Sequence, residues 1–132
     1  MKHKQVNLSK NQLIVLETIR KAKKPLKAYS ILSSVKKKGI NAPPQVYRAL
    51  EKLVEMAVIH KIESKNSYIA CNNKSCGSQT STTFLICEEC NNVVELEKDK
   101  ASSSYFEKIS KKFGFKYSEH NLEIFGQCEF CK

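Results

Sequence analysis

The sequence contains no tryptophan, only 4 glycines and no long apolar run. With so few glycines, it lacks the glycine-rich loops that bind nucleotide phosphates. No stretch approaches the roughly 18 consecutive apolar residues that a membrane-spanning helix requires. The N-terminal residues also lack the apolar core of a secretory signal. We therefore expect a cytoplasmic protein without a membrane partner.

Charge and cysteine are divided unevenly between the two halves of the chain. Residues 1–71 hold 15 Lys and Arg against 4 Asp and Glu, whereas residues 72–132 hold 8 against 9. The excess positive charge of the first half indicates an anionic partner, most simply double-stranded DNA. No cysteine precedes Cys71, and the other five follow it. This asymmetry predicts two units with two functions.

The order of the sequence patterns predicts an α+β fold in which two domains are joined by a linker. Residues 1–71 are expected to form a winged helix-turn-helix domain, and residues 84–132 a small α/β domain. Between them, residues 72–83 are polar and rich in serine, threonine and asparagine, a composition typical of loops and linkers.

Three helical patterns followed by a hairpin pattern lead to the winged-helix prediction. Ser9 and Gln12 have the spacing of a helix capping box, and an apolar stripe at helical spacing follows them. Gly39 is placed to end a second helix, and Pro43 is placed to open a third. Residues 58–71 alternate between β-branched and polar types, as in a hairpin. In such a domain the third helix enters the major groove and the hairpin forms the wing.

The second domain is expected to contain three strands and one helix. The strands are predicted over residues 84–87, 92–97 and 115–125, and the helix over residues 102–113. The apolar stripe of this helix consists of Tyr105, Phe106, Ile109 and Phe113.

Two Cys-x-x-Cys pairs, separated by 37 residues, have the spacing of a structural zinc site. Each pair forms a tight turn that directs two thiolates the same way, and two such turns can surround one ion. A zinc ion here would tie the C-terminus to the start of the second domain and contribute on the order of 10 kcal/mol to folding. The four predicted ligands are Cys87, Cys90, Cys128 and Cys131.

Disulfides, a redox pair and inert thiols are the competing interpretations of these cysteines. Stable disulfides are disfavoured because no export signal directs the chain to an oxidising compartment. A redox Cys-x-x-Cys motif usually opens a helix, whereas Cys90 precedes a turn and a strand. The spacing therefore favours structural zinc.

The expected recognition helix carries polar and basic residues opposite its apolar face. Arg48, one of only two arginines, suits a bidentate contact to guanine or to a phosphate, and Tyr47 beside it can bond or stack at the groove edge. The alternative is a solvated charged face with Tyr47 half-buried, but the charge of this half favours DNA. We expect DNA contacts from Gln45, Tyr47, Arg48, Lys52, Lys61 and Lys65.

The motifs P-P-Q-V-Y-R-A-L, H-K-I-E-S-K-N-S-Y-I-A-C and F-L-I-C-E-E-C together resemble the ferric uptake regulator (Fur) superfamily. The second motif is most similar to the zinc uptake regulator (Zur) branch, and the resemblance covers about residues 8–132. It implies a bacterial winged-helix domain hinged to an α/β dimerisation domain. It further implies a homodimer that zinc closes onto palindromic operators, repressing genes for zinc import.

The resemblance also implies a regulatory zinc site between the domains. His60, Cys71 and Glu95 match ligands that the family uses there. The family usually supplies a further histidine from the loop after the hinge cysteine, but residues 72–83 contain none. Cys76 is the strongest ligand type in that loop, so we expect it to complete the set. Two thiolates would favour zinc over ferrous iron.

A zinc-responsive repressor with one structural and one regulatory Zn²⁺ per chain is therefore the predicted function. The alternative is a Fur-type regulator that senses another metal, or thiol oxidation through Cys71 and Cys76. A zinc hydrolase is disfavoured because a catalytic zinc needs an open coordination position and a general base. We expect neither enzymatic activity nor a small-molecule substrate.

Overall fold

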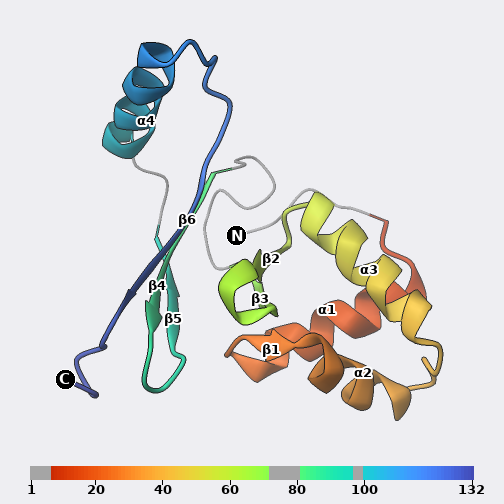
Figure 1. Cartoon of the computed structure of the whole chain (residues 1–132). Coiled ribbons are helices and arrows are strands. Elements are labelled where there is room, and N and C mark those ends of the chain that lie inside the picture. The colour runs from red at the N-terminus through yellow and green to blue at the C-terminus, as the bar shows by residue number, and fades with distance from the viewer. Residues whose placement is uncertain (1–6, 72–80, 97–99) are drawn as a thin grey trace.

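A computed structural model describes residues 7–71, 81–96 and 100–132, which form two small units (Figure 1). The first unit contains α1 (Lys10–Ala22), β1 (Leu26–Lys27), α2 (Ala28–Lys36), α3 (Pro43–Glu55), β2 (Ile59–Ile62), the 3-10 helix η1 (Glu63–Lys65) and β3 (Ser67–Ala70). The second contains β4 (Thr82–Cys87), β5 (Val93–Glu95), α4 (Lys100–Lys112) and β6 (Asn121–Gly126). The predicted α+β fold is confirmed.

Local sequence signals set the ends of the first helices. The Ser9 hydroxyl accepts the backbone N–H of Gln12, and the Gln12 side chain accepts the N–H of Ser9, which is the predicted capping box. Gly39 follows α2 with a φ of 101°, a left-handed conformation that lacks a steric cost only for glycine. Pro43 occupies the first turn of α3, where its missing N–H leaves no partner unsatisfied.

The first unit has a continuous apolar core that fixes the orientation of α3. The fully enclosed side chains come from all three helices and from the wing: Val15, Ile19, Ile31, Val35, Val46, Leu50, Leu53 and Ile59. Because α3 directs its apolar stripe into this core, its opposite face is exposed to solvent.

The predicted hairpin forms the wing, but it belongs to a larger sheet than expected. β2 pairs with β3, and β3 pairs in turn with β1, giving an antiparallel sheet ordered β1-β3-β2. β1 was not predicted, because two residues are too few to show an alternation of apolar and polar side chains. Ile62, at the end of β2, is fully buried, and it packs with Phe84 and Ile86 of the second unit. The wing, which is part of the first unit, therefore also packs against the second unit.

In the second unit β4 is the central strand of a sheet ordered β5-β4-β6. β4 runs antiparallel to β5 and parallel to β6, so a crossover that includes α4 connects the two parallel strands. The predicted linker reaches residue 83, yet β4 already begins at Thr82.

The prediction of a strand over residues 115–125 is wrong for residues 115–120, since β6 begins at Asn121. The backbone N–H groups of Gly114 and Phe115 donate to carbonyls in the last turn of α4. These bonds close the helix at residues 114 and 115. The segment first meets β4 at His120, whose carbonyl accepts the N–H of Thr82.

α4 buries no residue in the single chain. Tyr105, Phe106 and Ile109 of the predicted stripe lie on it, whereas Phe113 follows its last residue. The helix lies beyond the end of the second sheet, away from α1, α2 and α3 (Figure 1). Among the residues described, no helix combines the length and apolar character needed to cross a membrane.

Candidate metal centres and nucleic-acid interface

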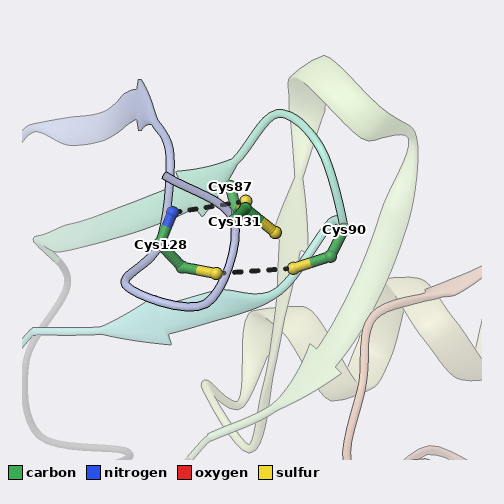
Figure 2. Close-up of side chains that lie close together, drawn as sticks. All are labelled: Cys87, Cys90, Cys128 and Cys131. Carbon is green, nitrogen blue, oxygen red and sulfur yellow. Dashed lines mark hydrogen bonds between the residues drawn. The ribbon is translucent and has the colours of Figure 1, made fainter.

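The four predicted zinc cysteines converge at one end of the second sheet (Figure 2). Cys87 ends β4, and its parallel pairing with Gly126 brings the C-terminal pair alongside the first pair. Zinc–sulfur bonds of about 2.3 Å in a tetrahedron place sulfur atoms about 3.8 Å apart. The sulfurs of Cys90 and Cys128 lie 3.7 Å apart, and all four fall within 4.8 Å of one another. This donor set fits a zinc ion.

The pKa values of the cluster thiols are shifted in opposite directions by their neighbours. Backbone N–H groups of Cys90 and Cys128 lower the pKa of Cys87 from 9.0 to about 6, because they stabilise its thiolate. The pKa of Cys131 is raised to about 12, chiefly by its hydrogen bond to the Cys128 side chain. Zinc binding requires thiolates, so it would release the protons that these cysteines carry.

A second cluster of metal-ligand type lies at the junction of the two units. His60 comes from β2, Cys71 follows β3, and Glu95 ends β5. The His60 Nε2 atom lies 3.1 Å from Glu95 Oε2, and the Cys71 sulfur lies 3.8 Å from the same oxygen. The side chains of His60 and Glu95 are only 11% and 3% exposed. Three of the four predicted regulatory ligands are therefore brought together.

The buried His60 nitrogen supports a metal at this cluster. Nε2 is fully enclosed, and among the described residues no hydrogen bond of acceptable geometry reaches it. A buried polar atom without such a bond is costly, and a metal ion would satisfy it. Phe84 packs edge-on against the imidazole at 5.7 Å and fixes its position. Cys71 is disulfide-bonded in the structure, so ligation by this residue requires its reduced thiolate.

The fourth predicted ligand, Cys76, lies outside the described residues.

The predicted DNA-contact residues fall into two groups. Gln45, Tyr47, Arg48 and Lys52 lie on the exposed face of α3, and the Lys52 ammonium is 3.5 Å from the Glu55 carboxylate. Lys61 and Lys65 lie instead on the wing and are half-buried. Lys61 is 3.5 Å from Glu63 and 6.0 Å from the centre of the Tyr68 ring. The helix group is therefore more exposed than the wing group.

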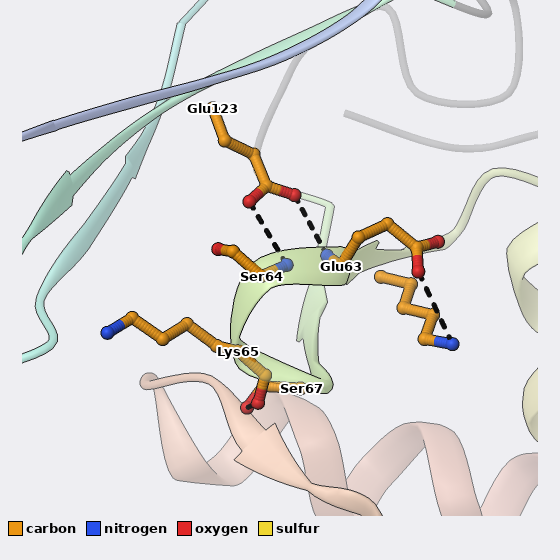
Figure 3. A network of polar contacts seen from close by, with 6 residues as sticks. Glu63, Ser64, Lys65, Ser67 and Glu123 are labelled. Carbon is orange, nitrogen blue, oxygen red and sulfur yellow. Dashed lines mark hydrogen bonds and ion pairs between the residues drawn. The ribbon is translucent and has the colours of Figure 1, made fainter.

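Sequence reasoning missed a contact between the wing and the second unit. Both carboxylate oxygens of Glu123, on β6, accept backbone N–H groups of η1, from Glu63 at 2.8 Å and from Ser64 at 3.2 Å (Figure 3). The partners are 60 and 59 residues apart in the chain. Backbone donors carry no sequence signature, so no motif indicates this contact.

The fold and the two ligand clusters define a winged-helix protein with two candidate metal centres, one of which joins its two units. The model of the ferric uptake regulator family matches residues 3–125. The chain belongs to this family.

Relatives and solved structures agree with this membership. The zinc uptake regulation protein of Escherichia coli (strain K12) is 33% identical over 127 residues, which cover 96% of this chain and 73% of the relative. A crystal structure of holo XcZur matches with a TM-score of 0.85 and 38% identity, over 96% of this chain and 87% of that one. A zinc uptake regulator complexed with zinc and DNA matches with a TM-score of 0.83 and 29% identity, over 96% and 84%.

Two states of XcZur match the structure unequally. The apo form gives a TM-score of only 0.50, although its sequence is 39% identical to this chain.

Proposed function

We propose that the protein is a zinc-responsive DNA-binding repressor that controls zinc uptake. Its family, and its similarity to the Escherichia coli zinc uptake regulation protein, support this function. The observation that carries the proposal is the cluster of His60, Cys71 and Glu95, whose members come from both units. A regulator of this kind acts on chromosomal DNA, so we place it in the bacterial cytoplasm and assign it no enzymatic activity.

We assign two zinc ions to each chain. The four-cysteine cluster would hold a structural ion, and its sulfur separations support this role. His60, Cys71 and Glu95 would hold a regulatory ion, with Cys76 as the proposed fourth ligand. Two thiolates make such a site soft and favour zinc over ferrous iron.

The regulatory ligands couple zinc to the angle between the units. His60 and Cys71 move with the wing, whereas Glu95 moves with the second sheet. When bound, the ion supplies the positive charge that keeps the thiolate and the carboxylate side by side. The three ligand atoms lie within 4.8 Å of one another in the described arrangement, so an ion held by all three would favour it. The coupling to DNA is reciprocal and typically amounts to about 1–3 kcal/mol.

A second copy of the chain is the expected partner for the outer face of the second sheet. Leu85 is paired with Val94 on one side and with Ile124 on the other, so the three side chains form an apolar row across all three strands. They are 40%, 47% and 46% exposed, and a hollow of about 400 Å³ lies on the same face. Such a patch marks an interface. We propose that it forms the homodimer.

The dimer would present two copies of α3 to a palindromic operator. Gln45, Tyr47 and Arg48 lie toward the start of the helix, which is the end that usually reads base edges. Lys52 extends the same face. Lys61 and Lys65 would contact phosphates from the wing, which adds affinity without sequence information.

DNA binding by the reduced full-length protein, with and without zinc, tests the proposed function. We expect tight operator binding with zinc and binding weaker by about 5- to 150-fold without it. Equal affinity in the two conditions would reject the role of zinc sensor.

A further inference from the structure

We infer that Glu123 is a positioning residue that fastens the wing to the second unit and favours the DNA-binding arrangement independently of zinc. This inference rests on the proposed function, because it concerns the same change in the angle between the units. Unlike the zinc ligands, Glu123 would act through a hydrogen-bonded carboxylate, at a point of the junction separate from the regulatory cluster.

The two backbone N–H groups that Glu123 accepts lie at the start of η1. Glu63 and Ser64 open η1, and the first N–H groups of any helical turn have no acceptor within it. The carboxylate uses one oxygen for each of them, at 2.8 Å and 3.2 Å (Figure 3). Bonds that involve an ionised group are stronger than those between neutral groups. The contact therefore contributes a specific attraction rather than mere proximity.

The register of the second sheet places Glu123 and the regulatory cluster at opposite ends of one row. Phe84 is paired with Glu95 on β5 and with Glu123 on β6. Directly paired residues project from the same face of a sheet. Glu95 meets His60, Phe84 packs against His60 and Ile62, and Glu123 meets the tip of the wing. The junction thus has a metal-ligand contact, an apolar contact and a carboxylate contact.

Linkage gives the carboxylate contact a distinctive consequence. The partners belong to different units, so the contact forms only when the units take the described arrangement. Replacing Glu123 would lower the population of this arrangement in zinc-free protein. Zinc affinity and zinc-free DNA affinity would then fall by a common factor. The DNA affinity of zinc-saturated protein would hardly change, because bound zinc already holds the units together.

Glu123→Gln is the test variant, because it keeps the shape of the side chain but retains only one acceptor oxygen. Glu119→Gln is the matched control. Glu119 and Glu123 line the same groove of about 290 Å³, so both variants remove one negative charge from it. Among the described residues, the Glu119 side chain makes no hydrogen bond to the wing. Both reduced full-length variants and the wild type are compared for zinc affinity at the labile site and for operator affinity with and without zinc.

For Glu123→Gln we expect zinc affinity and zinc-free DNA affinity to fall together by about tenfold, as the loss of charge-assisted bonds implies. The control should match the wild type. Unchanged affinities in Glu123→Gln would overturn the inference. The inference would also be overturned if DNA affinity fell equally with and without zinc and the Tm fell as well. That pattern indicates a merely structural role.

Failure of the proposed function would appear separately, in the wild type, as DNA binding that ignores zinc. Even then, zinc-free DNA binding by Glu123→Gln and Glu119→Gln would still show whether the carboxylate holds the wing.

Discussion

His60 Nε2 lies 3.1 Å from Glu95 Oε2, and the two residues belong to different units of the chain. His60 is on the wing that follows the DNA-facing helix, whereas Glu95 ends a strand of the second sheet. Both side chains are buried, so their approach depends on the arrangement of the units. With Cys71 beside them, they would, under the proposed function, convert metal binding into a fixed position of α3.

Replacing Cys71 should abolish the response to zinc without unfolding the protein. Cys71→Ser removes a thiolate from the junction but leaves the four-cysteine cluster intact. We expect one zinc ion to remain and the ratio of operator affinities with and without zinc to fall close to one. Zinc content and operator binding measure both effects. Cys90→Ser is the contrasting variant, which should lose the structural ion and unfold the second unit. If Cys71→Ser unfolds instead, Cys71 has a structural role.

Arg48 should contribute to DNA affinity but not to zinc binding. It is exposed on α3, a helix that supplies none of the assigned ligands. Loss of a bidentate base or phosphate contact costs about 1–3 kcal/mol, so Arg48→Ala should weaken operator binding by roughly 5- to 150-fold. The other arginine, Arg20, is exposed at the end of α1 and provides the control. If Arg48→Ala and Arg20→Ala lost the same amount of operator affinity, the effect of Arg48 would come from its charge alone and not from a specific contact.

The exposed apolar row should hold the dimer together. Leu85→Glu places a charge among Val94 and Ile124, where burial against a second copy would be costly. We expect sedimentation to show a monomer at concentrations where the wild type is dimeric. Leu13→Glu is the control, because Leu13 is a similarly exposed leucine on α1. A dimer that survives Leu85→Glu would place the interface elsewhere.

Acid should release the structural zinc as protons compete for its thiolates. The pKa of Cys87 is lowered to about 6, so the stability that its thiolate provides is present above the ordinary value of 9.0 and is lost as the pH falls through 6. Bound zinc must also be displaced, which moves the midpoint of release below about 6. A zinc-sensitive dye and far-UV circular dichroism should report release and unfolding together. Full retention of zinc at pH 4 would contradict thiolate ligation.

Local patterns predicted the helices and the hairpin because their signals are contained in short segments. The capping box of Ser9 and Gln12, the stop at Gly39 and the start at Pro43 each act within one turn. The four-cysteine cluster was equally predictable, since the pairs have zinc-ligand spacing. The regulatory ligands His60, Cys71 and Glu95 were selected by resemblance to the family, and the structure brings them within 4.8 Å of one another.

The features that the sequence did not predict depend on contacts between segments far apart in the chain. The contact of Glu123 with the wing depends on the β4–β6 register and on backbone donors 59 and 60 residues away. The strand predicted at residue 115 failed because the N–H of Phe115 caps α4. β1 exists because β3 offers it an edge, not because Leu26 and Lys27 have a strand pattern.

The most direct test of the central claim counts zinc ions per chain by native mass spectrometry, before and after mild chelation, with operator binding measured on the same samples. Two ions should be present at first. One should leave readily, and operator affinity should fall with it while the protein remains folded. The result that contradicts the account is undiminished operator binding by folded protein that has kept only its four-cysteine zinc.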